Sequence, residues 1–390
     1  MKIALLSEKY TPDLGGLAIS TGRLGDLLSS AGHDIRLFAP TPSTSLTTSS
    51  NLPPSEKQTL RPGRIHVTRF GAHKRVDDTL VDWFELIAAE HKREPFDLIH
   101  AYFLPQAGFV AAYAGKYLNI PSVVSIRGND IERAAFDPSK FSHVMYALQN
   151  ASAITTNASE LAKKAKAFID REIHVIPNGI DTERFKPTGK NLALAEALGL
   201  AEGKKKEERS AVIGFVGELR EKKGMATLLH ACAQADKATP ITLLVVGEIR
   251  PGDDRSVFGE FRSAHPDLQI IVTGHIPHKD LPAYYSLMDI FAHPSLRDGM
   301  PNAVLEAMAC GKAVIAAPVG GVLDILEDGK NGIAVNVNDA NMLSKIILEL
   351  SGDPDKRELL GKNARDLVVK RFTLEKELEA NLAVYRSLGL

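Results

Sequence analysis

Residues 297–318, RDGMPNAVLEAMACGKAVIAAP, constrain the fold most, because they join a helix that must be buried to a strand that follows it at once. Pro301 suits the first turn of a helix, where its missing N–H has no intrahelical partner. Gly311 suits the position just past the end, where a left-handed residue is needed. Between them Glu306 is the one charged residue in an otherwise apolar run. Because a helix that is apolar all round is buried, we predict an interior helix followed by a buried strand over 313–317.

Glu306 carries a carboxylate into that interior, where an unpaired charge is costly, and no Arg or Lys lies three or four residues away to pair with it. One alternative is a structural pair with a distant Lys or Arg. The other is a ligand, most simply a pair of hydroxyl groups. The helix start favours a ligand, because the N–H groups of Met300, Asn302 and Ala303 are expected to be unsatisfied there and to form an anion site. With Asp298 in the preceding loop, this pattern suits a nucleotide joined through phosphates to a polyhydroxylated group.

The rest of the chain alternates between short apolar runs and helical segments. A chain of 390 residues exceeds one ordinary core, so we expect two domains. The apolar runs predict about seven strands in the first half and about six in the second. They are 3–7, 35–39, 65–70, 97–101, 121–126, 153–156 and 173–177, then 212–217, 241–247, 269–274, 289–293, 313–317 and 332–337. This alternation predicts an α/β fold with two doubly wound, Rossmann-like parallel sheets, whose strand-end loops face one cleft.

Composition excludes several classes of function. The 47 basic and 48 acidic residues leave a formal net charge of −1, so no bulk attraction to nucleic acid is expected. The two cysteines, Cys232 and Cys310, give neither a disulfide framework nor a metal-ligand spacing. No apolar stretch approaches the ~18 residues of a membrane span, and the first apolar run is too brief for a signal peptide. We therefore expect a cytoplasmic protein, with peripheral contact at the inner face of a membrane left open.

Outside the strands, residues 41–64 are rich in Ser, Thr and Pro and predict a mobile loop. The charged block 204–209 predicts a surface loop. A helix over 79–90 carries the only tryptophan, Trp83, as a core residue. The last segment, 341–390, is expected to be helical with a break near 352–354.

Polar residues follow several strands of the first half. Gly15 and Gly16 let the backbone approach a ligand closely at a strand end, although two glycines alone can simply make a turn. His100 and Tyr102 come at the end of another strand. A lone histidine there is more often a satisfied structural group than a catalyst, but in a cleft it can contact an acceptor.

Arg127 and Asp130 follow the strand 121–126. The structural alternative is an Arg–Asp pair that caps the next helix. The functional alternative is that Arg127 binds a phosphate or an acceptor oxygen while Asp130 orients the guanidinium.

The sequence DGMPNAVLE, followed by AMACGKAVIAAPVGG, resembles the E-x7-E segment of the family 4 retaining glycosyltransferases. Asp298 stands in place of the first Glu and Glu306 matches the second. The resemblance implies a GT-B fold and a nucleotide-diphosphate-sugar donor, UDP- or GDP-linked, whose sugar is transferred to a hydroxyl acceptor with retention. It further implies that Glu306 holds the donor ribose and that Asp298 contacts the transferred sugar. Many members carry a His at the position that resembles Arg127, so no catalytic His is assigned.

The resemblance also covers a pattern of Gly, Arg and then Lys-Gly, whose end matches Lys223 and Gly224. Glu218 occupies the Arg position, which leaves Arg220 or Lys222 as the conjectured second cation for the diphosphate. Lys223 and the helix start then stabilise the departing diphosphate, and Arg127 closes the site from the other domain. Gly320 and Gly321 are expected to add free amides. The donor-binding set is completed by Gly15, Gly16, Gly274, His275, Ile276, Gly299, Met300, Pro301 and Asn302.

By the same resemblance, residues 1–180 form the acceptor-side domain, 181–365 the donor domain, and 366–390 a helix that packs back on the first domain. No metal and no cofactor are expected, and the acceptor-side residues are His100, Tyr102 and Asp130. Glycans, lipid-linked molecules and small molecules all qualify as acceptors, in polysaccharide, lipopolysaccharide or glycolipid biosynthesis.

Three other classes share parts of this pattern. A dinucleotide oxidoreductase also has parallel sheets, but G-x-G-x-x-G is absent after the first strand. A sugar-nucleotide epimerase on the same fold would act on the donor without an acceptor. A two-lobed binding protein without enzymatic activity would also close on a sugar, but it usually carries a secretory signal.

Overall fold

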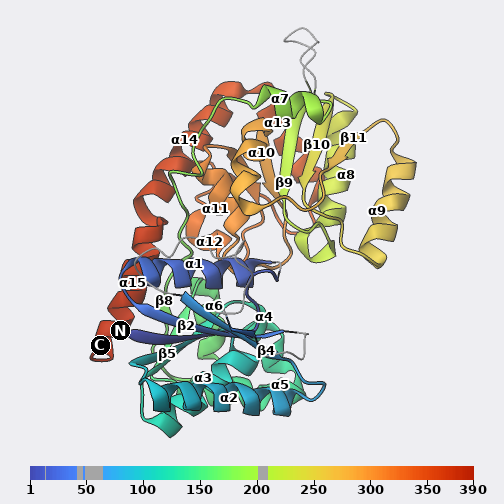
Figure 1. The fold of residues 1–390 in the computed structure, drawn as a ribbon. Coiled ribbons are helices and arrows are strands. Elements are labelled where there is room, and N and C mark those ends of the chain that lie inside the picture. The colour runs from blue at the N-terminus through green and yellow to red at the C-terminus, as the bar shows by residue number, and fades with distance from the viewer. Residues whose placement is uncertain (14, 42–46, 49–64, 201–209) are drawn as a thin grey trace. The chain divides into compact units, whose positions relative to one another are not determined.

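A computed structural model describes residues 1–13, 15–41, 47–48, 65–200 and 210–390 (Figure 1). It divides the chain into two compact units. Unit 1 contains Met1–Asn178 and Leu374–Leu390, and unit 2 contains Gly179–Thr373. The domain bounds expected from the sequence were 1–180, 181–365 and 366–390. Apart from residue 41 and residues 47–48, the loop expected at 41–64 lies outside the described residues, as does the one expected at 204–209.

Unit 1 is built on an eight-stranded sheet with the order β3-β4-β2-β1-β5-β6-β7-β8. Seven of these strands pair in parallel, and the short β3 pairs antiparallel with β4. The strands are β1 Lys2–Ser7, β2 Asp34–Thr41, β3 Thr47–Thr48, β4 Ile65–Gly71, β5 Leu98–Tyr102, β6 Ser122–Ile126, β7 Ala153–Thr156 and β8 His174–Val175. All seven expected parallel strands are present. β1, β5, β6 and β7 are short apolar runs buried along their whole length, as expected for parallel strands covered on both faces, whereas β4 and β8 are largely half-buried or exposed.

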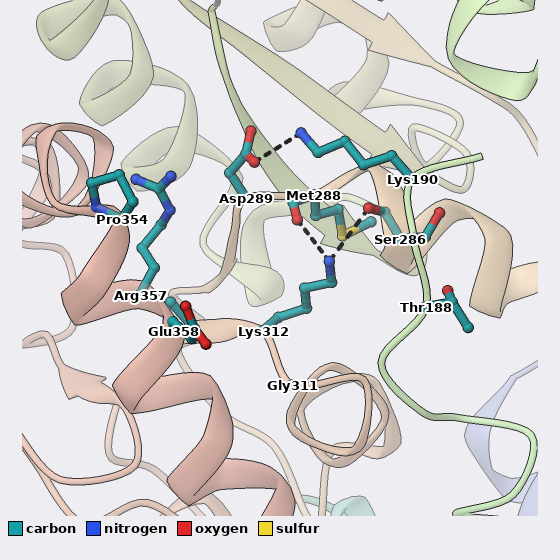
Figure 2. A pocket seen from close by; sticks show the side chains of 12 residues that line it. Thr188, Lys190, Ser286, Met288, Asp289, Gly311, Lys312, Pro354, Arg357 and Glu358 are labelled. Carbon is teal, nitrogen blue, oxygen red and sulfur yellow. Dashed lines mark hydrogen bonds and ion pairs between the residues drawn. The ribbon is translucent and has the colours of Figure 1, made fainter. Parts of the chain in front are cut away.

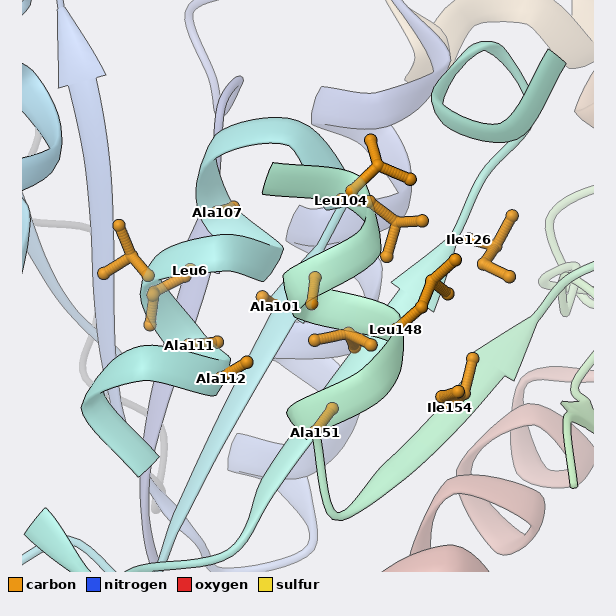
Figure 3. Close-up of a cluster of buried hydrophobic side chains, with 14 of the residues drawn as sticks. Leu6, Ala101, Leu104, Ala107, Ala111, Ala112, Ile126, Leu148, Ala151 and Ile154 are labelled. Carbon is orange, nitrogen blue, oxygen red and sulfur yellow. The ribbon is translucent and has the colours of Figure 1, made fainter. Parts of the chain in front are cut away.

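Helices cover both faces of this sheet (Figure 1). They are α1 Gly16–Ser30, α2 Val76–Arg93, the π-helix η3 Leu104–Gly108, α3 Phe109–Leu118, α4 Asn129–Glu132, the 3-10 helix η4 Ala134–Phe136, α5 Pro138–Asn150, α6 Ser159–Lys166 and α15 Leu374–Ser387. Alternate strand residues point to opposite faces. On one face, Leu6 and Ile126 belong to one buried cluster with side chains of α3 and α5, several of them alanines (Figure 3). On the other, Leu5 packs with α1 and α15. Trp83 is fully buried in the core, as expected.

Unit 2 contains a six-stranded parallel sheet with the order β11-β10-β9-β12-β13-β14. Its strands are β9 Ala211–Val216, β10 Ile241–Val246, β11 Gln269–Val272, β12 Ile290–His293, β13 Ala313–Ala316 and β14 Ile333–Ala334. Its helices are α7 Leu192–Ala197, η6 Glu221–Lys223, α8 Met225–Asp236, α9 Asp253–Ala264, η7 His278–Asp280, α10 Leu281–Leu287, α11 Asn302–Ala309, α12 Val322–Ile325, α13 Ala340–Gly352 and α14 Pro354–Arg371. The predicted fold class, two parallel α/β domains, is confirmed.

The helical C-terminal segment breaks twice. The expected break falls between α13 and α14. A second break, at Phe372 and Thr373, was not predicted, and the chain passes there from unit 2 to unit 1. Within unit 1, α15 is fixed to α1 by Arg23, whose guanidinium donates to both carboxylate oxygens of Glu377 at 2.6 and 3.2 Å.

Helix α11 is the buried helix that the sequence predicted. Pro301 is its N-cap and not its first helical residue, so the expected position was wrong by one residue. Gly311 takes the left-handed conformation expected after the helix, with φ +68°. A side chain on Gly361 of α14 would overlap the carbonyl oxygen of Gly311. The packing of α14 on the end of α11 therefore requires a glycine at position 361.

We expect Gly361→Ala to lower the free energy of unfolding by about 1–3 kcal/mol, because the new methyl group has no space. Gly259→Ala in α9 is the matched control, since its methyl group would meet no atom within 4 Å. That variant should gain about 0.5–1 kcal/mol from the lower backbone entropy of its unfolded state. Urea unfolding of both variants measures the difference. Equal effects of the two changes would contradict the close contact.

Candidate functional site

The strand order of unit 2 reverses between β9 and β12, and ligands of open α/β sheets bind at such a switch point, outside the carboxyl ends of the strands. The loops that follow these two strands lie against each other, and the N–H of Leu296 donates to the carbonyl of Lys222 at 3.0 Å. Gly224 makes this possible, because its φ is +75° and a side chain there would overlap the carbonyl of Pro294. The site residues predicted on both loops are thereby brought together.

Lys223 and Asp298 form an ion pair at this switch point, through Lys223 Nζ and Asp298 Oδ2. The same Oδ2 lies 3.1 Å from Nε2 of His293, and the N–H of Gly299 donates to Oδ1 at 3.0 Å. Burial alone would raise the pKa of Asp298, but Lys223 and His293 outweigh it and hold this pKa well below its usual range. Asp298 is therefore a firmly ionised carboxylate in contact with a cation.

His293, the last residue of β12, was missed by the sequence analysis. Its ring is buried and lies parallel to those of Phe215 and Phe291, at centroid distances of 6.1 and 6.2 Å. Burial lowers the pKa of His293, so the ring is neutral, and next to anionic Asp298 the Nε2–H tautomer is the one that donates. A histidine at a predicted strand end, beside the switch point, was the signal available in the sequence.

Glu306 has partners that neither sequence alternative named. Its side chain is 4% exposed, and Oε1 lies 2.8 Å from Nε2 of His278. The hydroxyl of Tyr285 lies 2.8 Å from Oε2 and 3.1 Å from the carbonyl of Ala303. A distant Lys or Arg as structural partner is therefore wrong. An ionised carboxylate offers about four lone-pair sites, so two donors leave capacity for ligand hydroxyls, and the ribose role stays a prediction.

The backbone at the start of α11 is less open than expected. Met300 is buried in the core and, like Asn302, takes part in an interaction within the chain. The N–H of Gly321 donates to the carbonyl of Gly299, so the expectation of a free amide at Gly321 was wrong. The two segments are held together by this bond.

Glu218, which departs from the resembled pattern, lies beside the conjectured second cation. Its Oε2 is 3.3 Å from Nη1 of Arg220. Gly274, His275 and Ile276 follow β11 as predicted, next to a hollow of about 450 Å³ that Gly274 helps to line. Their contact with a donor stays a prediction.

In unit 1, Asp130 holds the backbone of its own turn. Its carboxylate accepts hydrogen bonds from the N–H groups of Arg127 at 2.9 Å, Gly128 at 2.8 Å and Ile131 at 3.1 Å. Both sequence alternatives, which paired Asp130 with the Arg127 guanidinium, were wrong in this respect. Burial raises the pKa of Asp130 to about 6.

The guanidinium of Arg127 has other partners. It donates to Oδ1 of Asn178 at 2.8 Å and lies over the ring of Tyr102, 4.4 Å from its centroid. Gly15 precedes α1 with φ +114°, whereas Gly16 is the first residue of that helix. Contact of these residues with a donor stays a prediction.

His100 is fully buried in unit 1. Its Nδ1 lies 2.7 Å from the hydroxyl of Tyr385 and its Nε2 2.8 Å from that of Ser125. Burial and the nearby Arg127 lower the pKa of His100 to about 3. These contacts favour the structural alternative for His100, and Tyr102 is likewise buried.

A second hollow in unit 2, of about 380 Å³, lies at the opposite edge of the sheet, where β13 begins (Figure 2). Lys190 pairs there with Asp289 at 2.9 Å. Lys312 donates to carbonyl groups at the end of α10, and Arg357 to carbonyls at the end of α13. The C-terminal ends of helices carry negative partial charge, so these cations are already offset, and the hollow is distinct from the predicted donor site.

Two family models match the chain. Residues 14–184 match Glycosyltransferase Family 4, and residues 200–367 match Glycosyl transferases group 1. The chain is a family 4 glycosyltransferase. It is 23% identical to an uncharacterized glycosyltransferase of Methanocaldococcus jannaschii, over 100% of this chain and 99% of the other.

This glycosyltransferase is also 25% identical to the GDP-mannose-dependent alpha-mannosyltransferase of Corynebacterium glutamicum, over 87% of this chain and 78% of the other. HepE of Anabaena, solved in complex with UDP, shares its GT-B fold with a TM-score of 0.80 and 22% identity, over 99% of this chain and 100% of the other. Within the described ranges, no three His, Cys, Asp or Glu side chains group so that they could hold a metal ion. None of the described helices has the length and hydropathy to cross a bilayer.

We expect Tyr285→Phe to lower the free energy of unfolding by about 1–3 kcal/mol, because a buried carboxylate oxygen loses its donor. Tyr284→Phe is the matched control on the same helix, since Tyr284 is only partly buried. Thermal and urea unfolding compare the two. A loss of the same size in both variants would show that the hydroxyl of Tyr285 does not support Glu306.

Proposed function

We propose that this glycosyltransferase transfers the sugar of a UDP-sugar or GDP-sugar donor to a hydroxyl acceptor with retention of anomeric configuration. The observation that carries the proposal is Glu306, a buried carboxylate kept in place by His278 and Tyr285 next to the switch point. A carboxylate fixed by two donors is suited to accept hydrogen bonds from the two hydroxyls of a ribose. The GDP-mannose-dependent relative supports a nucleotide-sugar donor.

The Lys223–Asp298 ion pair matches the junction of such a donor. The cation suits the diphosphate, as a point charge on phosphate oxygens, and the carboxylate suits the hydroxyls of the attached sugar. His293 and the N–H of Gly299 fix the carboxylate orientation. Because the two charges touch, the site places a positive and a negative group side by side, as the adjoining phosphate and sugar require.

In the proposed reaction the acceptor oxygen forms a bond to the anomeric carbon while the bond from that carbon to the phosphate oxygen breaks. The departing phosphate takes the proton of the acceptor hydroxyl. Lys223 stabilises the negative charge that develops on the diphosphate, which is electrostatic catalysis. No carboxylate nucleophile is required, and donor binding is proposed to need no metal. Glycan, lipid-linked and small-molecule acceptors are alternatives, and peripheral membrane contact belongs with the lipid-linked one.

We expect one of UDP, GDP and ADP to raise the free energy of unfolding by about 2.7 kcal/mol at a hundredfold excess over its dissociation constant. Glu306→Gln should abolish the shift, because an amide cannot accept from two hydroxyls as a carboxylate does. Glu349→Gln, on an exposed ion pair of α13, is the control and should keep it. A shift with NADH alone, or one unaffected by Glu306→Gln, would contradict the donor site.

The corresponding nucleotide sugar should then be turned over in the presence of excess chelator, and NMR of the product should show the anomeric configuration of the donor. Complete loss of activity with chelator would contradict metal independence. An inverted product would contradict retention. Epimerisation of the nucleotide sugar incubated alone would favour the epimerase alternative.

A further inference from the structure

Three neighbouring strands of unit 1 end at one edge of its sheet, and each is followed by a residue that keeps exposed surface. Glu8 follows β1, Phe103 follows β5 and Arg127 follows β6, and all three are half-buried. The acceptor-side residues predicted from the sequence, His100, Tyr102 and Asp130, are instead fully buried or nearly so. The groups available to a ligand at this edge are therefore different from the predicted ones.

The carboxyl group of Glu8 is fixed in place at this edge. Its Oε1 accepts a hydrogen bond from the N–H of Gln106 at 3.0 Å, and the N–H of Ala107 also faces it. Both donors belong to η3, which begins directly after Phe103. Because β1 and β5 are paired neighbours with Ser7 opposite Tyr102, the residues that follow them, Glu8 and Phe103, begin adjacent loops at this edge.

The backbone of Phe103 is strained, with φ +85° in a residue that is not glycine. Two hydrogen bonds impose this conformation. The N–H of Phe103 donates to the carbonyl of Ser125 at 3.0 Å, and its carbonyl accepts from the N–H of Gly108 at 2.9 Å. Strain of this kind concentrates where a structure holds a ligand.

The electrostatics of the edge disfavour a negatively charged ligand. Burial and the charge of Asp130 raise the pKa of Glu8 to about 7, while the N–H groups of Gln106 and Ala107 and the charge of Lys140 lower it. Near neutral pH Glu8 is therefore partly protonated and partly ionised, so its carboxyl group can both donate and accept hydrogen bonds. Arg127, the cation that follows β6, is engaged by Asn178 and Tyr102.

We propose that Glu8 and Phe103 form the acceptor subsite of unit 1 and that it takes an uncharged sugar ring. Glu8 hydrogen-bonds to hydroxyl groups of the ring, and Phe103 packs on its apolar face. This inference depends on the proposed function only in naming the bound sugar an acceptor, because the binding itself involves unit 1 alone.

Saturation-transfer NMR on the full chain, without nucleotide, tests the subsite. The probes are methyl glycosides of glucose, galactose, mannose and N-acetylglucosamine, together with the 6-phosphates of the same sugars. At least one methyl glycoside should bind, and its 6-phosphate should bind no better. Glu8→Gln, which keeps an oxygen for the N–H of Gln106, should weaken binding about tenfold or more, because a hydrogen bond to a charged group is lost. Phe103→Leu should weaken it as well.

The controls are Glu160→Gln on α6 and Phe136→Leu, an exposed residue of η4, and both should bind the glycoside as the wild type does. Absence of glycoside binding, preference for the 6-phosphates, or equal binding by wild type and Glu8→Gln would overturn the proposal. If the glycosides bind through Glu8 while no nucleoside diphosphate stabilises the protein, the subsite stands and the proposed donor function fails.

Discussion

The burial of one carboxylate is the constraint on which the site of unit 2 depends. Glu306 lies inside α11, and a charge in that position requires donors that the helix itself does not contain. The donors come from the segment before α10 and from α10, which therefore must pack with His278 and Tyr285 facing α11. The hydrogen bonds to the two carboxylate oxygens of Glu306 thus fix the position of two helices next to the switch point.

Close contact between backbones is the second constraint, and glycine makes it possible. Gly224 lets the loop after β9 lie on Pro294, and Gly320 lets the loop after β13 lie on the carbonyl of Asp298. A side chain at either position would separate the loops. Because the loops touch, Lys223 reaches Asp298, and two residues far apart in the sequence form one charged pair.

Much of the fold could be predicted because parallel strands buried on both faces read as short apolar runs, and Gly311 marks the end of α11. Asp298, Lys223 and Glu306 were placed from local pattern and from family resemblance. Their partners were not, because His278, Tyr285 and His293 meet them only through tertiary packing. Asp130 is a different case, because its three N–H donors lie within its own turn and the sequence analysis paired it with the Arg127 guanidinium instead. The break before α15 was not predicted because no Gly or Pro marks the end of the helix.

The two units place their carboxyl groups in opposite electrostatic settings. In unit 2 the pKa of Asp298 is depressed, so its contribution to stability is present above the ordinary Asp pKa and is lost only as pH falls. In unit 1 the pKa values of Glu8 and Asp130 are raised to about 7 and about 6, so stability decreases as pH rises from their ordinary values toward these. A permanently ionised carboxylate beside a cation suits a charged diphosphate sugar. A carboxyl group near its midpoint suits an uncharged polyol, which both donates and accepts hydrogen bonds. The division of carboxyl chemistry between the units therefore parallels the proposed division between a charged donor and a neutral acceptor.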